Sequence, residues 1–349
     1  MPRNLQSRPL ARAGAVLAVL AATATTAATT APAASAAVAP HDVRPAAAPA
    51  PATPGAVLPD SVGPRPTTPP DLLAVTGEDH GLYVQIGGDG NWMDLGGSLR
   101  SAPVMAFGWG DLYFVAAGRD SVPYIRSFEQ GWRRLGPAGV ACADPAVTTD
   151  EDTLSVACRG ADGHLLIGKA AIPERGLPHV TRFTDRGGDL RYGGLAGIEQ
   201  DGSAYYEGVG RDHVVYATSD KGGLTPASET LRCYGSVSQD ALGEGGAACR
   251  AQDATLQVSA NDAADADGFT TLRGSTVGRP GVAVDDDGTS RYYVLGTGGR
   301  IYRAGQAAGG ALTGFTRIGG RGLYGLTAAS LAPSMAASAA QGALRSLHR

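Results

Sequence analysis

The sequence contains very little lysine and no cluster of basic residues. Only Lys169 and Lys221 are lysines among the 29 basic residues, and 33 acidic residues give the chain a net charge of −4. Binding to nucleic acid or to an anionic membrane surface depends on clustered positive charge. We therefore expect no nucleic-acid partner and no attachment to an anionic membrane.

Aromatic residues and catalytic motifs are also scarce. Aromatic side chains make up 6% of the chain, and the six histidines are scattered. The sequence has no Gly-x-Ser-x-Gly, no His-Glu-x-x-His and no phosphate-binding loop, the motifs that indicate serine hydrolases, zinc peptidases and nucleotide-binding enzymes. We expect no enzyme activity, no cofactor and no metal ion.

Long apolar runs are absent apart from an Ala-rich stretch over residues 15–28, which is short for a membrane span. Arg3, Arg8 and Arg12 precede this stretch, and small residues follow it up to Ala36. This order is typical of a secretory signal peptide. We expect residues 1–36 to be removed on export, so that the mature protein is secreted and soluble.

The remaining chain divides into three parts by composition. Residues 37–70 are Pro, Ala and Thr with almost no large apolar side chain, which predicts a disordered linker. Residues 331–349 are rich in Ala and Ser and are predicted to be a disordered tail. Residues 71–330 are expected to form one domain.

Glycine is abundant, with 51 residues, and turn residues separate short apolar segments throughout the domain. A Gly-x-Asp turn, in places degraded, recurs about every 40 to 50 residues, the spacing of a four-stranded propeller blade. The six copies begin at Gly77, Gly118, Gly160, Gly210, Arg250 and Gly296. The first unit lacks its first strand, and residues 323–328 supply a matching strand at the other end. We expect an all-β, six-bladed β-propeller in which this C-terminal strand pairs with the N-terminal blade.

The positions of the four cysteines provide a separate test of the predicted repeat. Cys142 and Cys158 are 16 positions apart, as are Cys233 and Cys249, and both pairs occupy equivalent places in their repeats. These places lie opposite each other in an antiparallel strand pair, within disulfide distance. Of the three connectivities that four cysteines allow, we predict Cys142–Cys158 and Cys233–Cys249. A metal site is the alternative, but Cys-x-x-Cys spacing is absent.

The repeat resembles the PLL-like β-propeller lectins of bacteria. The resemblance is carried by the Gly-x-Asp turn, Leu-Tyr, Trp-x-x-Leu-Gly-Gly and Ser-x-Pro-Val of residues 72–136 and is weaker over the later units. It implies a propeller fold and, from the lectins of the family, fucose-type sugars bound in shallow sites between adjacent blades. Those lectins typically have seven units, and here Trp occupies the last strand only at Trp92 and Trp132.

Most of the recurring residues are expected to be structural. Trp92 and Trp132 recur at one repeat position with Phe183, Phe269 and Phe315, so we expect them to pack between blades rather than to bind sugar. The Gly-x-Asp aspartates are expected to hold their turns. Two acidic runs, Asp262 to Asp267 and Asp285 to Asp287, faintly resemble calcium loops but lack the full series of ligands.

The candidate ligand-binding residues are those that differ between the units. Trp109 lies in a Gly-Trp-Gly turn and is expected to be exposed, and Arg119, Tyr124 and Arg211 lie near other turns, where they can bond hydroxyl groups. The leading hypothesis is a secreted, non-catalytic, lectin-like propeller that binds carbohydrate. The alternatives are a scaffold with a protein partner, and a degenerate glycosidase suggested by the partial likeness of residues 218–224 to a sialidase Asp-box.

Overall fold

The computed structural model describes residues 71–87, 91–150, 152–198, 203–219, 222–228, 231–240, 246–259, 269–285, 287–306 and 311–331. All of them belong to the compact unit Pro49–Arg349, and the unit Met1–Ala48 lies outside the described residues. The predicted signal peptide and linker also lie outside them, as does the predicted tail beyond Leu331. Leu331 itself is buried.

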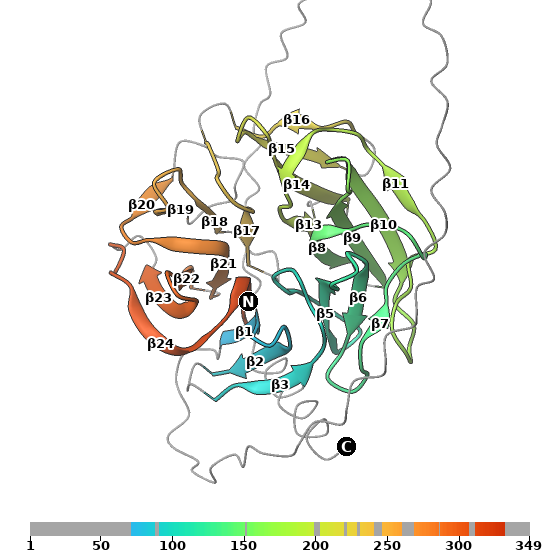
Figure 1. Ribbon diagram of the computed structural model, residues 1–349, viewed down its shortest axis with the longest axis horizontal. Coiled ribbons are helices and arrows are strands. Elements are labelled where there is room, and N and C mark those ends of the chain that lie inside the picture. Colours follow the sequence, from blue (N-terminus) through green and yellow to red (C-terminus); the bar gives the residue numbers. More distant parts are fainter. Residues whose placement is uncertain are drawn as a thin grey trace, which may run out of the picture. The chain divides into compact units, whose positions relative to one another are not determined.

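The described residues contain 25 strands and no helix, which confirms the predicted all-β class. In this part of the chain there is accordingly no helix with the length and apolarity to cross a membrane. The strands form five sheets, antiparallel except for one parallel pairing in the largest, that follow one another around a common axis, the arrangement of a β-propeller (Figure 1).

Four of the sheets have the size of a single blade. The first contains β4 (Val104–Gly108), β5 (Asp111–Ala117), β6 (Pro123–Arg126) and β7 (Arg133–Arg134). The second contains β8 (Ala143–Asp150), β9 (Thr153–Arg159), β10 (Leu165–Ala171) and β11 (Phe183–Asp185). The third contains β12 (Leu190–Tyr192), β13 (Ala196–Ile198), β14 (Ala204–Gly210), β15 (Val215–Ser219) and β16 (Thr225–Pro226). The fourth contains β17 (Ser238–Gln239), β18 (Ala247–Arg250), β19 (Leu256–Ser259) and β20 (Thr270–Leu272).

The fifth sheet has eight strands and brings the two ends of the domain together. One half contains β21 (Thr276–Val284), β22 (Ser290–Gly296), β23 (Arg300–Gln306) and β24 (Thr316–Arg321). The other half contains β25 (Leu323–Ser330), β1 (Asp71–Thr76), β2 (Leu82–Ile86) and β3 (Met93–Gly96). The C-terminal strand β25 pairs with β1 from Asp71↔Ser330 to Thr76↔Leu323.

The expectation of six separate blades is therefore not met, because two blade-sized halves share one sheet. They are joined by a single parallel bridge, Arg279↔Gly325. A Cβ atom on Gly325 would lie 2.2 Å from the Arg279 backbone nitrogen. Glycine at this position lets β21 and β25 approach closely enough to pair.

The core lies between neighbouring sheets, so the inner strands are buried on both faces. Every residue of β1 is buried, whereas both residues of the outermost strand β7 are exposed. Leu72 packs with Phe114 on one face of β1, and Leu73 packs with Tyr293 on the other. Side chains alternate along a strand, so adjacent leucines serve two different cores.

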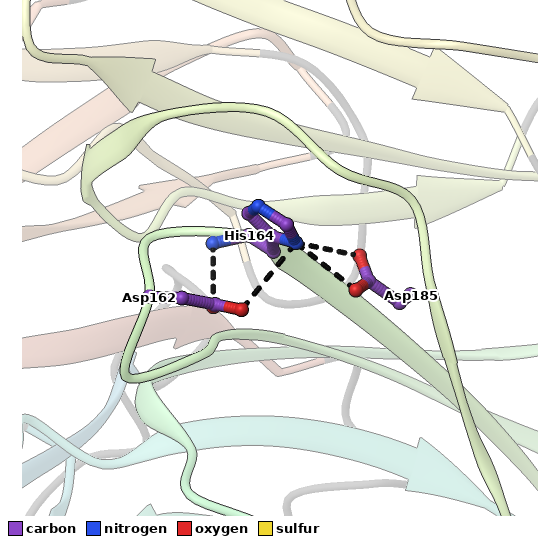
Figure 2. A group of neighbouring side chains, drawn as sticks. All are labelled: Asp162, His164 and Asp185. Atoms are coloured by element: carbon purple, nitrogen blue, oxygen red, sulfur yellow. Dashed lines mark hydrogen bonds and ion pairs between the residues drawn. The ribbon is translucent and has the colours of Figure 1, made fainter. Parts of the chain in front are cut away.

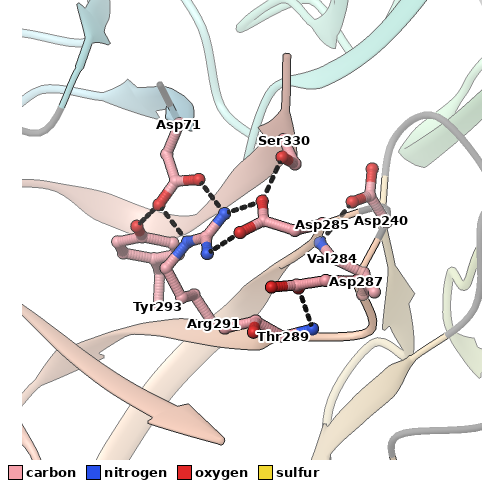
Figure 3. A network of polar contacts seen from close by, with 9 residues as sticks. All are labelled: Asp71, Asp240, Val284, Asp285, Asp287, Thr289, Arg291, Tyr293 and Ser330. Atoms are coloured by element: carbon pink, nitrogen blue, oxygen red, sulfur yellow. Dashed lines mark hydrogen bonds and ion pairs between the residues drawn. The ribbon is translucent and has the colours of Figure 1, made fainter. Parts of the chain in front are cut away.

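A buried ion network ties the two ends of the domain to β22 (Figure 3). Arg291 donates to both oxygens of Asp71 at 2.6 Å and to Asp285 Oδ2 at 2.6 Å. Tyr293 also donates to Asp71, and Ser330 donates to Asp285 Oδ1 at 2.5 Å. The guanidinium group of Arg291 on β22 thus binds Asp71 on β1 directly and is linked to Ser330 on β25 through Asp285.

Both predicted disulfides are present. Cys142–Cys158 and Cys233–Cys249 have Cα separations of 5.0 and 5.7 Å, and no cysteine is free. The first links the residue before β8 to β9, and the second reaches β18. Each bond therefore lies within one blade-sized sheet, as the register predicts.

Candidate functional site

The Gly-x-Asp turns are held by their aspartates. In five turns Oδ1 of the aspartate accepts a bond of 3.0 or 3.1 Å from the backbone N–H two residues later: Asp79–Gly81, Asp120–Val122, Asp162–His164, Asp212–Val214 and Asp253–Thr255. In three turns a tyrosine hydroxyl donates to Oδ2 at 2.8–2.9 Å: Tyr83 to Asp79, Tyr124 to Asp120 and Tyr216 to Asp212. The recurring aspartates are therefore structural, as predicted.

Large side chains near the outermost strands, aromatic in four of five pairs, pack on glycines of a neighbouring repeat. A Cβ atom on the glycine would lie 2.4–3.0 Å from the partner side chain in the pairs Gly97–Trp132, Gly136–Phe183, Gly188–Leu224, Gly274–Phe315 and Gly320–Trp92. Trp132 Nε1 also donates to the Gly96 carbonyl oxygen at 2.9 Å. The predicted packing role of Trp92 and Trp132 is confirmed, but Trp92 has a second role.

Trp92 lines an open pocket of about 380 Å³ where the last repeat meets the first. The lining residues are Val75, Gly77, Glu78, Asp79, Tyr83, Trp92, Gly320 and Arg321. Strands β1 and β2 and the turn between them supply one wall, and the end of β24 supplies the other. Residues about 240 positions apart in the chain therefore share one pocket.

Two half-buried aromatic rings line the pocket, and charged side chains stand at its exposed rim. Arg321 Nη1 lies 3.3 Å from Glu78 Oε1, and both side chains are more than half exposed. Burial, followed by the hydrogen bond to Asp79, raises the pKa of Tyr83 to about 12, so its hydroxyl stays a donor at neutral pH. The pocket thus combines aromatic faces with hydrogen-bond donors and acceptors, the make-up of a small-molecule site.

The structure does not bring the four predicted ligand-binding residues together. Trp109 is 61% exposed, as expected, at the tip of a two-residue hairpin between β4 and β5. Arg119 follows β5, so the seven-residue strand, roughly 20 Å long, separates it from Trp109. Leu99 N donates to His80 O and Leu99 bridges Gly118, which places the pocket at the Arg119 end. Trp109 therefore lies at the far end from the pocket.

The other two candidates are bonded to the framework. Tyr124 is the Asp120 partner, and burial, followed by that hydrogen bond, raises the pKa of Tyr124. Arg211 Nε donates to Asp189 Oδ1 at 2.6 Å on the exposed surface. Sequence reasoning missed Glu78, Tyr83 and Arg321, because their proximity depends on the pairing of β25 with β1. The match of residues 323–328 to the missing first strand was the available signal.

A second polar group lies between β9, β10 and β11 (Figure 2). His164 Nδ1 is 3.0 Å from Asp185 Oδ2 and 3.4 Å from Asp162 Oδ2. The hydrogen bond to Asp185 raises the pKa of His164, and the same bond lowers the pKa of Asp185. The sequence analysis missed this group because Asp185 is 21 residues from His164 and the three residues form no known motif.

The faint calcium loops gain no support from the described residues. Asp285 belongs to the buried network, and Asp287 Oδ1 accepts a bond from Thr289 N at 2.8 Å. Asp286 and the run from Asp262 to Asp267 lie outside the described residues.

Comparisons with known proteins find no matching protein-family model and no similar curated protein. Among solved structures, the chain is similar to the BP39L lectin from Burkholderia pseudomallei, with a TM-score of 0.49 and 14% identity over 73% of this chain and 82% of that one. It is also similar to the SapL1 lectin in complex with alpha methyl fucoside (TM-score 0.46, 13% identity, 64% and 83% covered). A third similar structure is the GH43_1 enzyme from Xanthomonas citri complexed with xylotriose (TM-score 0.41, 12% identity, 68% and 94% covered).

Proposed function

We propose that the protein is a secreted, non-catalytic propeller that binds a neutral carbohydrate in the pocket between its last and first repeats. The observation that carries this proposal is the combination of Trp92 and Tyr83 with Glu78, Asp79 and Arg321 around one open cavity. Aromatic faces stack on the C–H face of a sugar ring, and charged planar groups form strong hydrogen bonds with its hydroxyl groups.

The charge of the pocket selects against anionic sugars. Glu78 and Asp79 carry two negative charges and Arg321 carries one positive charge, so the lining is net negative at neutral pH. A sialic acid or a sugar phosphate would meet like charge here. A neutral sugar can bridge the carboxylate and guanidinium groups without such repulsion.

The engagement of both carboxylates supports non-catalytic binding. Asp79 accepts bonds from Gly81 N and from the Tyr83 hydroxyl, and Glu78 pairs with Arg321. A glycosidase needs one carboxyl group free to donate a proton and another on the opposite side of the scissile bond. Glu78 and Asp79 are instead neighbours in the same turn.

The blade number in this proposal is six. The eight-stranded sheet divides at the single bridge between β21 and β25 into two four-stranded halves. With the four separate sheets, these halves support a count of six blades, with β25 as the fourth strand of the blade that contains β1, β2 and β3.

Export is supported by the two disulfides, since such bonds persist in oxidising compartments.

A glycan array with the disulfide-intact protein tests the proposal. We expect binding to neutral sugars, and titration calorimetry should show that Glu78→Gln and Arg321→Gln each weaken it about tenfold, the effect of one hydrogen bond to a charged group. Arg317→Gln, an exposed arginine of the same strand β24, is the matched control and should bind as the parent does.

Absence of binding to every sugar on the array would reject the carbohydrate function. Binding that is unchanged in both pocket variants would reject the pocket as its site. Turnover of chromogenic glycosides by the parent protein would reject the non-catalytic assignment.

A further inference from the structure

We propose that Asp162, His164 and Asp185 form a surface site for one divalent transition-metal ion of the zinc class. The site is separate from the carbohydrate pocket and does not depend on it. His164 lies between the two carboxylates, which come from the β9–β10 turn and from the end of β11 (Figure 2).

The spacing of the three donor atoms suits a small ion. One donor atom from each residue lies within 4.8 Å of the other two. His164 Nδ1 is 3.0 Å from Asp185 Oδ2 and 3.4 Å from Asp162 Oδ2. In a tetrahedral zinc site, with bonds of about 2.0–2.1 Å, neighbouring ligand atoms are roughly 3.3 Å apart. The separations of His164 Nδ1 from the two carboxylates are therefore already near those that a bound zinc ion requires.

Backbone groups hold both carboxylates in place. His164 N donates to Asp162 Oδ1 at 3.0 Å, and Gly187 N donates to Asp185 Oδ1 at 2.7 Å. Asp162 Oδ2 and both oxygens of Asp185 face the imidazole ring. Hydrogen bonds of this kind orient metal ligands and tune their affinity.

The other repeats show that the fold does not require this arrangement. His164 lies two residues after its turn aspartate. The equivalent residues of other turns are Gly81, Val122, Val214 and Thr255. Leu166 lies four residues after the turn aspartate. In three other turns this position is a tyrosine whose hydroxyl donates to Oδ2 of the turn aspartate. This repeat alone thus combines the loss of the tyrosine with the gain of a histidine, which leaves Asp162 Oδ2 facing His164.

The donor set selects the ion. Imidazole nitrogen suits zinc and its neighbours in the first transition series, whereas calcium and magnesium prefer oxygen donors alone. The two carboxylates balance the charge of a divalent ion. Three protein ligands leave the fourth position of a tetrahedral ion to water or to an external donor.

The experiment is calorimetric titration of untagged, disulfide-intact, chelator-treated protein with zinc chloride. We expect one zinc site, no saturable heat with calcium chloride, and visible absorption bands typical of tetrahedral cobalt when Co²⁺ replaces zinc. His164→Val, which installs the residue of two other turns, should abolish this site. His179→Ala, another exposed histidine of the same sheet region, should leave it unchanged.

A second variant removes no ligand. Leu166→Tyr restores the tyrosine of the other turns, and Gly160 leaves room for its ring as Gly77, Gly118 and Gly210 do for theirs. The introduced tyrosine hydroxyl should donate a hydrogen bond to Asp162 Oδ2. We therefore expect zinc affinity to fall about tenfold or more, the usual effect of disturbing the hydrogen-bond partners of a metal ligand. Thermal unfolding confirms that each variant is folded.

Three outcomes would overturn the proposal. They are no zinc site in the parent protein, equal zinc affinity in folded His164→Val, and calcium binding as tight as zinc binding.

Discussion

At the residue scale, close contact between repeats depends in five places on a glycine that faces a large side chain. Gly320 accommodates the indole of Trp92, and a Cβ atom there would lie 2.7 Å from Trp92 Nε1. The adjacent Gly319 also has a positive φ but has nothing within 4 Å of such an atom. Replacing each of these two glycines with alanine therefore distinguishes the cost of a left-handed backbone, which both positions share, from the cost of a steric clash, which only Gly320 has.

We expect Gly320→Ala to destabilise the protein by about 1–3 kcal/mol more than Gly319→Ala, because only the former overpacks the contact with Trp92. The φ angles are +76° at Gly320 and +95° at Gly319, so backbone strain alone predicts no extra cost for the Gly320 variant. Urea unfolding of both variants measures the difference. Equal free energies of unfolding would show that Trp92 moves aside without cost.

Trp109 provides a second prediction at this scale. It lies at the opposite end of β5 from the pocket and is 61% exposed. We expect Trp109→Ala to leave sugar affinity unchanged and to alter stability by only about 0.5 kcal/mol, as for other surface substitutions. Calorimetric titration with the sugar found on the array measures the first effect. A large loss of sugar affinity would instead show that the sugar binds at the Trp109 turn.

At the element scale, the two disulfides fasten equivalent strand pairs. Each closes a loop with the same sequence separation of 16 residues. In the loop-entropy model the two bonds should therefore contribute equally to stability. Any difference between them reports on the folded environment of each pair.

Replacing both Cys142 and Cys158 with serine should lower the free energy of unfolding by about 3 kcal/mol. The corresponding double variant at Cys233 and Cys249 should lose about the same amount. Urea unfolding under non-reducing conditions measures both. Losses below about 0.5 kcal/mol, the range of ordinary surface substitutions, would contradict the expectation.

The sequence was sufficient to predict the elements but not the site. Turn residues at regular spacing predicted short strands, and the cysteine register predicted both disulfides, since both depend on local order along the chain. Trp109 was chosen because it differs between repeats, but sequence difference does not reveal at which end of a strand a turn lies. The pocket joins Glu78 to Arg321, a proximity that only the paired ends of the domain create.

At the scale of the whole molecule, the buried network explains how the first and last strands are fastened. Arg291 is the common partner of Asp71 on β1 and Asp285 at the end of β21. Burial alone would raise the pKa of Asp285, but the bonds from Arg291 and Ser330 outweigh it and lower that pKa. Asp285 therefore adds stability at neutral pH, and this contribution is lost as the pH falls through its folded-state pKa.

Arg291→Met should cost about 3–5 kcal/mol at pH 7, because it leaves buried carboxylates without their partner. Without the guanidinium, burial favours the protonated carboxyl groups, so the variant regains stability as the pH falls from 7 to about 4. The parent keeps the contribution of Asp285 over this range, because the lowered folded-state pKa of Asp285 lies below it. The difference in free energy of unfolding should thus shrink between pH 7 and about pH 4. Urea unfolding across this range tests the prediction, with the exposed Arg303→Met of β23 as control. A gap that is constant with pH would exclude this role for the carboxylates.

The pairing of β25 with β1 has a consequence for the order in which the protein is made. The strands β1, β2 and β3 are the first strands of the domain to be synthesised, yet the strand that lies beside β1 is among the last. Until then one edge of β1 stays unpaired, and an open strand edge invites pairing with other chains. A message truncated before codon 323 would therefore yield a chain in which β1 never gains its partner β25, a natural substrate for chaperones and proteases.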